Sequence, residues 1–144
     1  MNKKKQRLII WALFSLVVLI YVAHIAQMKL RVREVRTRIH RQDPVSILCG
    51  CRELIAERTN LASDWQNVQH LPAGTVVLDS KITPYTEAVP RVIREIHPDK
   101  IIICKDHVFL SMCSAPRYEV IGFKAGAAQH GTIQLVDGLW ILEE

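Results

Sequence analysis

Acidic residues are nearly absent from the first 41 residues, which contain ten lysines and arginines and a single acidic residue, Glu34. The remainder of the chain, residues 42–144, has nine basic and thirteen acidic residues. The overall charge of +5 therefore combines a net +9 in the first segment with a net −4 in the second. Nucleic-acid binding requires a cationic surface on the folded part of a protein, so we predict no nucleic-acid partner.

Recognisable catalytic and ligand-binding motifs are also missing. The four cysteines do not have the spacing of a zinc ribbon or zinc finger. The glycine-bounded segment 126–131, GAAQHG, lacks the lysine and the hydroxyl residue of a phosphate-binding loop. The chain contains no internal repeat and no low-complexity run. We therefore assign no catalytic, cofactor-binding or metal-ligating residue and expect no cofactor.

The dominant feature that is present is one long apolar run, from Leu8 to Met28 (LIIWALFSLVVLIYVAHIAQM). As a helix, these 21 residues extend about 31 Å, enough to cross the hydrocarbon core of a bilayer. A lone span must be helical because only a helix satisfies its own backbone hydrogen bonds in lipid. Trp11 and Tyr21 suit the two headgroup regions. We predict a single transmembrane helix over 8–28 that contacts the lipid bilayer.

The alternative is a cleaved signal peptide, because the basic tail 1–7 precedes the apolar run. Cleavage after Ala23 or Ala26 would place Tyr21 or His24 three residues before the cut. Signal peptidases require a small residue at that position, and the run is long for a signal core. We therefore expect a retained signal anchor and a membrane location.

Residues 29–41 (KLRVREVRTRIHR), which we call the stalk, contain no glycine or proline that would end a helix. The positions from Arg31 to Arg41 are rich in arginine and suit anionic lipid headgroups. A stripe of apolar residues runs along one helical face: Met28, Val32, Val35 and Ile39. Two interpretations compete. The stripe packs on the chain's own domain or the lipid interface, or it pairs with a second copy to form a homodimer.

The orientation in the membrane depends on the same charges. Four lysines and arginines precede the span, and six follow it within about 15 residues. This excess favours a cytoplasmic location for the carboxyl-terminal domain. A short basic tail before an apolar helix is also typical of signal anchors that export their domain, so the alternative stays open.

Residues 42–144 predict one small α+β domain, with two helices on one face of an antiparallel meander sheet. Asp43-Pro44 is a typical helix start, and Asp137-Gly138 is the strongest hairpin signal. The apolar run 101–104 predicts a strand buried on both faces. The expected helices are 44–58 and 86–96, and the expected strands are 75–79, 101–104, 108–113, 118–123, 132–136 and 139–142.

The cysteines are interpreted mainly as structural thiols. Cys49 and Cys51 would lie about 200° apart around a helix, so they cannot bind one ion together. Cys104 and Cys113 lie in predicted strands, and no neighbouring base activates Cys104. Disulfides remain an alternative that requires an exported domain.

His107 beside Asp106 is the most enzyme-like pair, but we place it in an exposed turn with no nucleophile nearby. The carboxylates Glu143 and Glu144 are interpreted as solvated surface. Trp140 is expected to pack in the core, the alternative being an edge that accepts a partner strand.

The sequence thus predicts a single-pass membrane protein whose domain is a non-catalytic protein-interaction or scaffold module with an unidentified protein partner. The alternative is a membrane-tethered enzyme or a metal or redox protein. Its candidate residues are Cys104, Cys113, His107 and His130.

Overall fold

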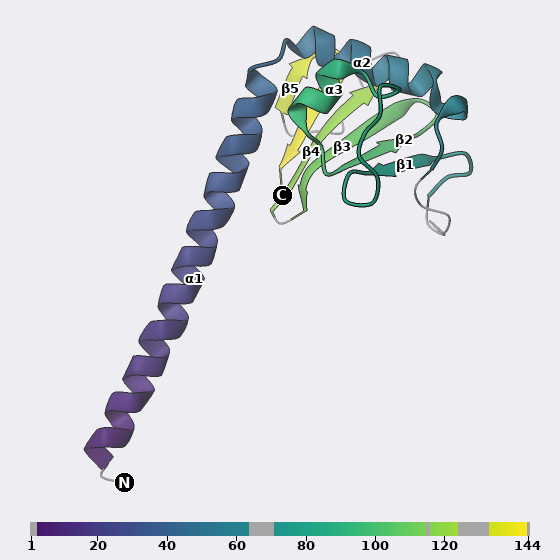
Figure 1. The fold of residues 1–144 in the computed structure, drawn as a ribbon. Helices are drawn as coiled ribbons and strands as arrows, with labels where there is room; N and C mark the ends of the chain where they lie inside the picture. The colour runs from purple at the N-terminus through teal and green to yellow at the C-terminus, as the bar shows by residue number, and fades with distance from the viewer. Residues whose placement is uncertain (1–2, 64–70, 115, 124–132, 144) are drawn as a thin grey trace.

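The computed structural model describes residues 3–63, 71–114, 116–123 and 133–143 (Figure 1). Within these residues the chain forms three α-helices, one short 3-10 helix and six strands. The helices are α1 (Lys3–His40), α2 (Pro44–Ala56), η1 (Arg58–Asn60) and α3 (Arg91–Ile96). The strands are β1 (Val76–Asp79), β2 (Lys100–Ile103), β3 (His107–Ser114), β4 (Arg117–Phe123), β5 (Ile133–Val136) and β6 (Leu139–Glu143). This arrangement confirms the α+β class.

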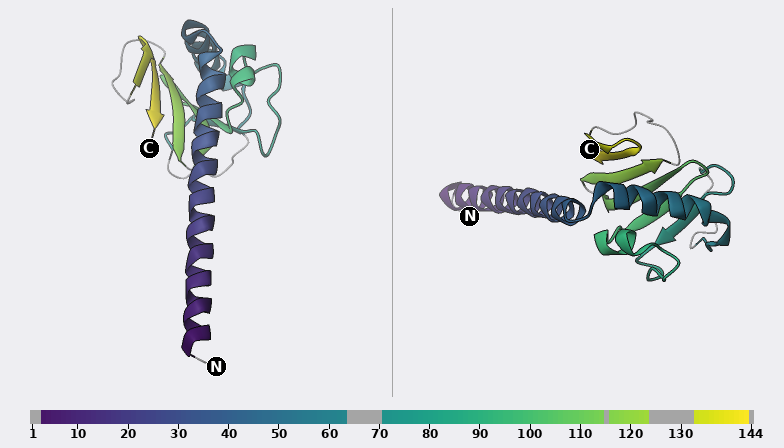
Figure 2. Two further views of the ribbon diagram at one scale, coloured as in Figure 1. Left: turned by 90° about the vertical axis from the view of Figure 1, so that its left-hand side faces the viewer. Right: turned by 90° about the horizontal axis from the view of Figure 1, so that it is seen from above.

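Helix α1 is a single unbroken helix of 38 residues. It joins the predicted span and the stalk without a kink-forming proline or glycine, and its amino-terminal half extends clear of the domain (Figure 2). None of its most apolar 18-residue window is buried by the rest of the chain. Trp11 and Leu19, for example, are 68% and 69% exposed. Among the described residues it is the one helix long and apolar enough to cross a membrane, which makes it a candidate membrane anchor.

Helix α2 begins as the sequence predicts. Asp43 is the N-cap residue, and its carboxylate accepts a hydrogen bond from the backbone N–H of Ser46 at 3.0 Å. Pro44 occupies the first helical turn, where its missing N–H leaves no hydrogen bond unmade. The helix ends at Ala56, two residues before the predicted end, and η1 follows.

The second predicted helix, 86–96, is wrong in its first half. Helix α3 begins at Arg91, after Pro90 with φ −50° and ψ 140°. Proline disfavours a helical conformation in the residue before it, so Thr86–Val89 forms a turn closed by a bond from Val89 N–H to Thr86 C=O. Val89 is nevertheless buried, as its place in the apolar pattern predicts.

The six strands form one antiparallel sheet in the order β1-β2-β3-β4-β6-β5. The predicted meander holds for β1 to β4 but is wrong at the last hairpin, because β6 rather than β5 pairs with β4. This order places the more apolar strand inside the sheet and leaves β5, with Ile133 47% exposed, at the edge. The predicted turn at Asp137-Gly138 is confirmed, and Gly138 supplies a positive φ of 90°.

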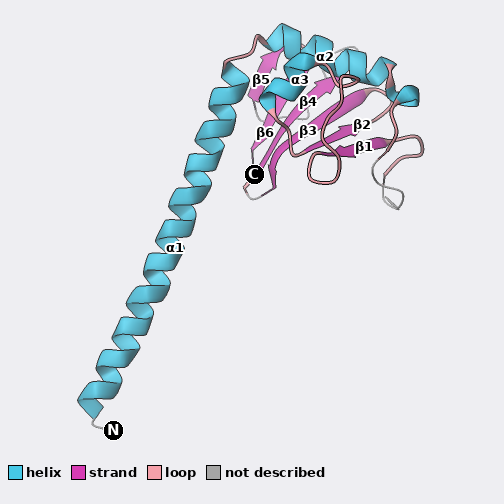
Figure 3. Ribbon diagram, in the orientation of Figure 1, coloured by secondary structure: helices cyan, strands magenta, loops and turns pink. Residues whose placement is uncertain are grey.

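Helices α2 and α3 lie on the same side of the sheet, and the main core fills the space between these helices and the sheet (Figure 3). Ile101 and Ile103 are fully buried there, whereas Ile102 on the opposite face is only half-buried. The prediction that this strand is buried on both faces is therefore wrong. A second apolar cluster comprises Ile121, Phe123 and Trp140. Trp140 packs as predicted, in an internal strand and not at an edge.

The contact between α2 and the sheet is close at one point. A Cβ atom added to Gly122 in β4 would lie 2.6 Å from the Cβ atom of Cys51 in α2. No side chain larger than hydrogen fits there without moving one of the two elements. This contact sets the distance at which α2 packs across the sheet (Figure 2).

Candidate functional site where the stalk meets the sheet

The apolar stripe of the stalk packs on the chain's own domain. Val35 and Ile39 are 3% and 1% exposed and belong to the main core cluster, and Val32 packs against its rim. Of the two interpretations that the sequence left open, the structure therefore shows the intramolecular one for these residues. The homodimer stays a prediction.

An ion pair joins the stalk to the last strand. The guanidinium of Arg36 donates from Nε to Glu143 Oε1 at 2.8 Å and from a terminal nitrogen to Oε2 at 2.6 Å. The hydrogen bonds and the charge of Glu143 raise the pKa of Arg36. Because the Arg36 side chain is 50% exposed, the pair adds at most about 1 kcal/mol to stability. Its bidentate geometry adds a directional contact between α1 and β6.

The expectation that Glu143 is solvated surface is therefore wrong. Its side chain is 27% exposed and paired with Arg36. The neighbouring hydroxyl of Tyr118 has a raised pKa, mainly because of burial and also because of the charge of Glu143. Glu144 lies outside the described residues.

Two further contacts join α3 to the stalk and to Gln42, the residue that follows the stalk. A terminal nitrogen of Arg38 donates to the backbone carbonyls of Ile96 and His97, both at 3.4 Å, at the carboxyl end of α3. Gln42 donates from its side-chain nitrogen to Glu95 at 3.1 Å. The stalk is thus held by apolar packing, an ion pair and backbone contacts, and the described residues contain no loop between the apolar run and the domain.

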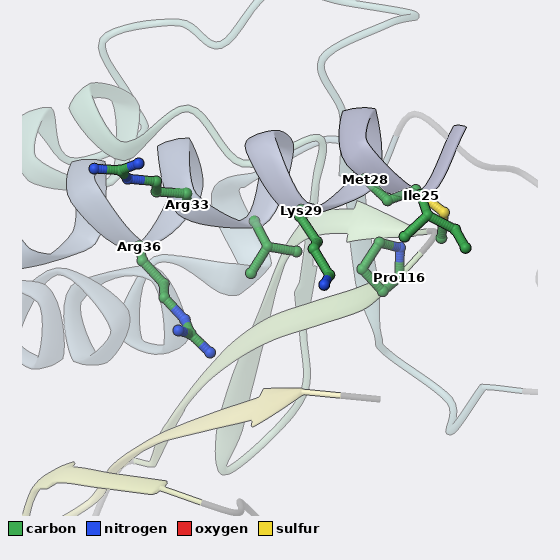
Figure 4. Close-up of a pocket in the computed structure, with 7 residues that line it drawn as sticks. Ile25, Met28, Lys29, Arg33, Arg36 and Pro116 are labelled. Carbon is green, nitrogen blue, oxygen red and sulfur yellow. The ribbon is translucent and has the colours of Figure 1, made fainter. Parts of the chain in front are cut away.

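A cavity of about 690 Å³ opens beside this junction (Figure 4). It is lined by one face of α1 and by the turn between β3 and β4: Ile25, Met28, Lys29, Val32, Arg33, Arg36 and Pro116. The side chains of Lys29 and Arg36 extend from α1 toward the strands, and Lys29 ends beside Pro116. The cavity combines an apolar wall from the end of the candidate span with cationic groups from the stalk.

The candidate residues of the enzyme, metal or redox alternative do not form one site in the structure. Cys104 and His107 flank the hairpin between β2 and β3, and the backbone N–H of Cys104 donates to the carbonyl of His107 at 2.8 Å. Cys113 lies six residues further along β3, about 20 Å away at the rise of a strand. His130 lies outside the described residues. The three placed residues therefore do not share one pocket.

Burial suppresses thiolate formation at Cys51 and Cys104. It raises the pKa of Cys51 to about 12 and also raises the pKa of Cys104. Only Cys49 is exposed. None of the four cysteines, all of which lie in the described part of the chain, forms a disulfide. The described ranges also contain no cluster of three His, Cys, Asp or Glu side chains suited to a metal ion.

The placement of His107 in an exposed turn is wrong. It is the first residue of β3, its side chain is 26% exposed, and its ring contacts the ring of Phe109 edge-on with centroids 4.8 Å apart. Its Nδ1 lies 2.6 Å from the carboxylate of Asp106, which lowers the pKa of Asp106. Asp106 itself is 76% exposed, so this pair is a surface contact.

Sequence reasoning missed the junction itself. Arg36 and Glu143 are 107 residues apart, and no local pattern indicates that a stalk arginine meets the last strand. Comparison with known proteins adds no further guide, because no family model, curated protein or solved structure matches this chain.

Proposed function

We propose that the chain is a single-pass membrane protein whose α+β domain is a non-catalytic module that binds a second protein at the membrane surface. The observation that supports this proposal is the continuity of α1. One helix runs from an apolar segment, whose most apolar 18-residue window has no buried residue, into a stalk whose Val35 and Ile39 are core residues of the domain.

This continuity determines where the domain would sit. Val32, the first stalk residue that packs on the domain, follows Met28 by four residues, about 6 Å of helix. A span ending at Met28 therefore holds the domain against the headgroups, with Pro116 near the bilayer. A fixed height and orientation suit a module that presents one surface to a partner in or beside the same membrane.

The alternative, a membrane-tethered enzyme or redox protein, has less support. Cys113 lies about 20 Å from His107 along β3, so the three residues do not form one site, and burial raises the pKa of the Cys104 thiol. A nucleophile needs the opposite, a lowered pKa and an adjacent base. The pair of His107 and Asp106 has no third group that would make it a catalytic set among the described residues.

Photocrosslinking in living cells tests the interaction proposal. Among the domain residues that the structure describes, three large apolar side chains are exposed: Val45, Ile82 and Ile133. A photoreactive residue at each position of the full-length chain is expected to give a discrete protein adduct at one of them. The adduct should disappear in a variant whose core is disrupted, Ile93→Asp, and persist in His107→Ala. Absence of any adduct, or loss of the cellular role in a folded His107→Ala protein, would contradict the proposal.

We also propose that the domain faces the cytoplasm, because six of the ten cations of the first segment follow the apolar run. Cys49 is the exposed cysteine, so a membrane-impermeant maleimide should label the protein only after the membrane is opened. The variant Cys49→Ser should remove this labelling. Prompt labelling of Cys49 in intact cells would place the domain outside.

A further inference from the structure

We infer that the cavity between α1 and the β3–β4 turn binds the headgroup of an anionic phospholipid from the surrounding bilayer. This inference rests on the proposed function, because it requires α1 to span a membrane. It goes beyond a general attraction between the arginines of the stalk and a charged surface, since it assigns a defined site between one face of α1 and Pro116.

The position of the cavity matches the depth of lipid headgroups. Ile25 and Met28 belong to the last turn of the apolar run, and Lys29 is the next residue. A span over 8–28 places this turn at the boundary between acyl chains and headgroups. Ile25 and Met28 are partly covered, unlike most of the span, because Pro116 lies across from them (Figure 4).

The charge of the cavity selects an anion. Arg36 is neutralised by Glu143, which leaves Lys29 and Arg33 as the cations that carry a net positive charge. Neither of these two makes an ion pair with any residue that the structure describes. A zwitterionic lipid carries its own cation beside the phosphate. An anionic lipid has a net negative charge, which would neutralise Lys29 and Arg33.

The shape of the cavity suits a headgroup with its glycerol. A volume of about 690 Å³ lies within the usual range of small-molecule sites, about 300–1,000 Å³. Its walls are divided: Ile25, Met28 and Val32 offer an apolar surface to the first acyl carbons, and Lys29 extends toward the strands where a phosphate would lie.

Native mass spectrometry of the full-length protein tests the site. The protein is released from nanodiscs of phosphatidylcholine and phosphatidylglycerol in equal amounts, and retained lipids are counted. We expect one phosphatidylglycerol to be retained in preference to phosphatidylcholine. Lys29→Gln should reduce this retention about fivefold, the factor expected for loss of one cation near the surface, and Lys29→Arg should preserve it.

The matched control is Arg31→Gln. Arg31 lies within two residues of Lys29 along the helix but about 200° around it, and it does not line the cavity. It should leave retention unchanged. Equal losses in Lys29→Gln and Arg31→Gln, or no preference for phosphatidylglycerol in the wild type, would overturn the site. Displacement of the lipid by millimolar inorganic phosphate would assign the cavity to a soluble anion and also overturn it.

Failure of this inference is distinguishable from failure of the proposed function. If the protein resists alkaline extraction from membranes but retains no anionic lipid, the lipid site is wrong and the anchor stands. If the protein is released by alkaline carbonate, the anchor is wrong and the lipid site falls with it. Photocrosslinked protein adducts at the domain surface report on the partner proposal independently of either result.

Discussion

Truncation of Ile39 tests whether the end of α1 is part of the domain core. Ile39 is 1% exposed and belongs to the same cluster as residues of α2, α3 and the sheet. Ile39→Ala removes three carbon atoms, about 2.4 kcal/mol at roughly 0.8 kcal/mol per buried methylene. The cavity that remains adds to this cost, and such truncations typically total about 2–5 kcal/mol. Small domains are stable by only about 5–15 kcal/mol, so the effect is large.

The assay is the urea dependence of protease resistance, measured on the full-length protein in a mild detergent. Ile39→Ala should lower the urea midpoint clearly, and Ile39→Val should lower it less, by the equivalent of about 0.5–1.5 kcal/mol in the free energy of unfolding. Leu30→Ala is the control, because Leu30 is on the same helix but 64% exposed, and it should change stability by less than about 0.5 kcal/mol. Equal midpoints for Ile39→Ala and Leu30→Ala would refute the conclusion that the stalk is built into the core.

Three further predictions concern the domain. Ile93→Asp should abolish protease resistance, because Ile93 is fully buried and a buried unpaired carboxylate costs several kcal/mol. His107→Ala should leave the fold intact, and the same protease digest measures both variants. Gly122→Ala should lower the thermal midpoint by the equivalent of about 1–3 kcal/mol, because its Cβ atom would clash with Cys51; an unchanged midpoint would show that α2 shifts freely. In an NMR titration Asp106 should ionise below its ordinary value of 3.8, and His107→Ala should raise that pKa. A carboxylate whose pKa is lower in the folded state stabilises the fold at pH values above its unfolded-state pKa, and this stabilisation is lost as the pH falls through its folded-state pKa. Because Asp106 is 76% exposed, little change in stability should accompany its titration.

Local patterns predicted the elements well where short-range physics decides them. The uninterrupted apolar and basic runs predicted α1, and the N-cap at Asp43 predicted the start of α2. The turn at Asp137-Gly138 was also predicted, since its geometry depends on residues next to one another. The predicted start of this helix at residue 86 is wrong because Pro90 disfavours a helical conformation in the residue before it, so α3 begins only after Pro90, at Arg91.

The arrangement of the elements could not be predicted from local patterns. The exchange of β5 and β6 in the sheet depends on which strand buries more apolar surface against the whole domain. The ion pair between Arg36 and Glu143 joins residues 107 positions apart, and the cavity at the junction likewise combines residues of α1 with the distant Pro116. The partial burial of His107 is missed for the same reason, because Phe123 of the neighbouring strand β4 brings its ring to a centroid distance of 5.8 Å from that of His107.

The measurement that tests the central claim most directly is alkaline carbonate extraction combined with intact-mass analysis of the mature chain. The account predicts that the full-length protein stays in the membrane pellet and that its mass includes the basic tail and residues 8–28. Release into the supernatant, or a mature chain that begins near residue 27, would show that the apolar part of α1 is removed and would contradict the account.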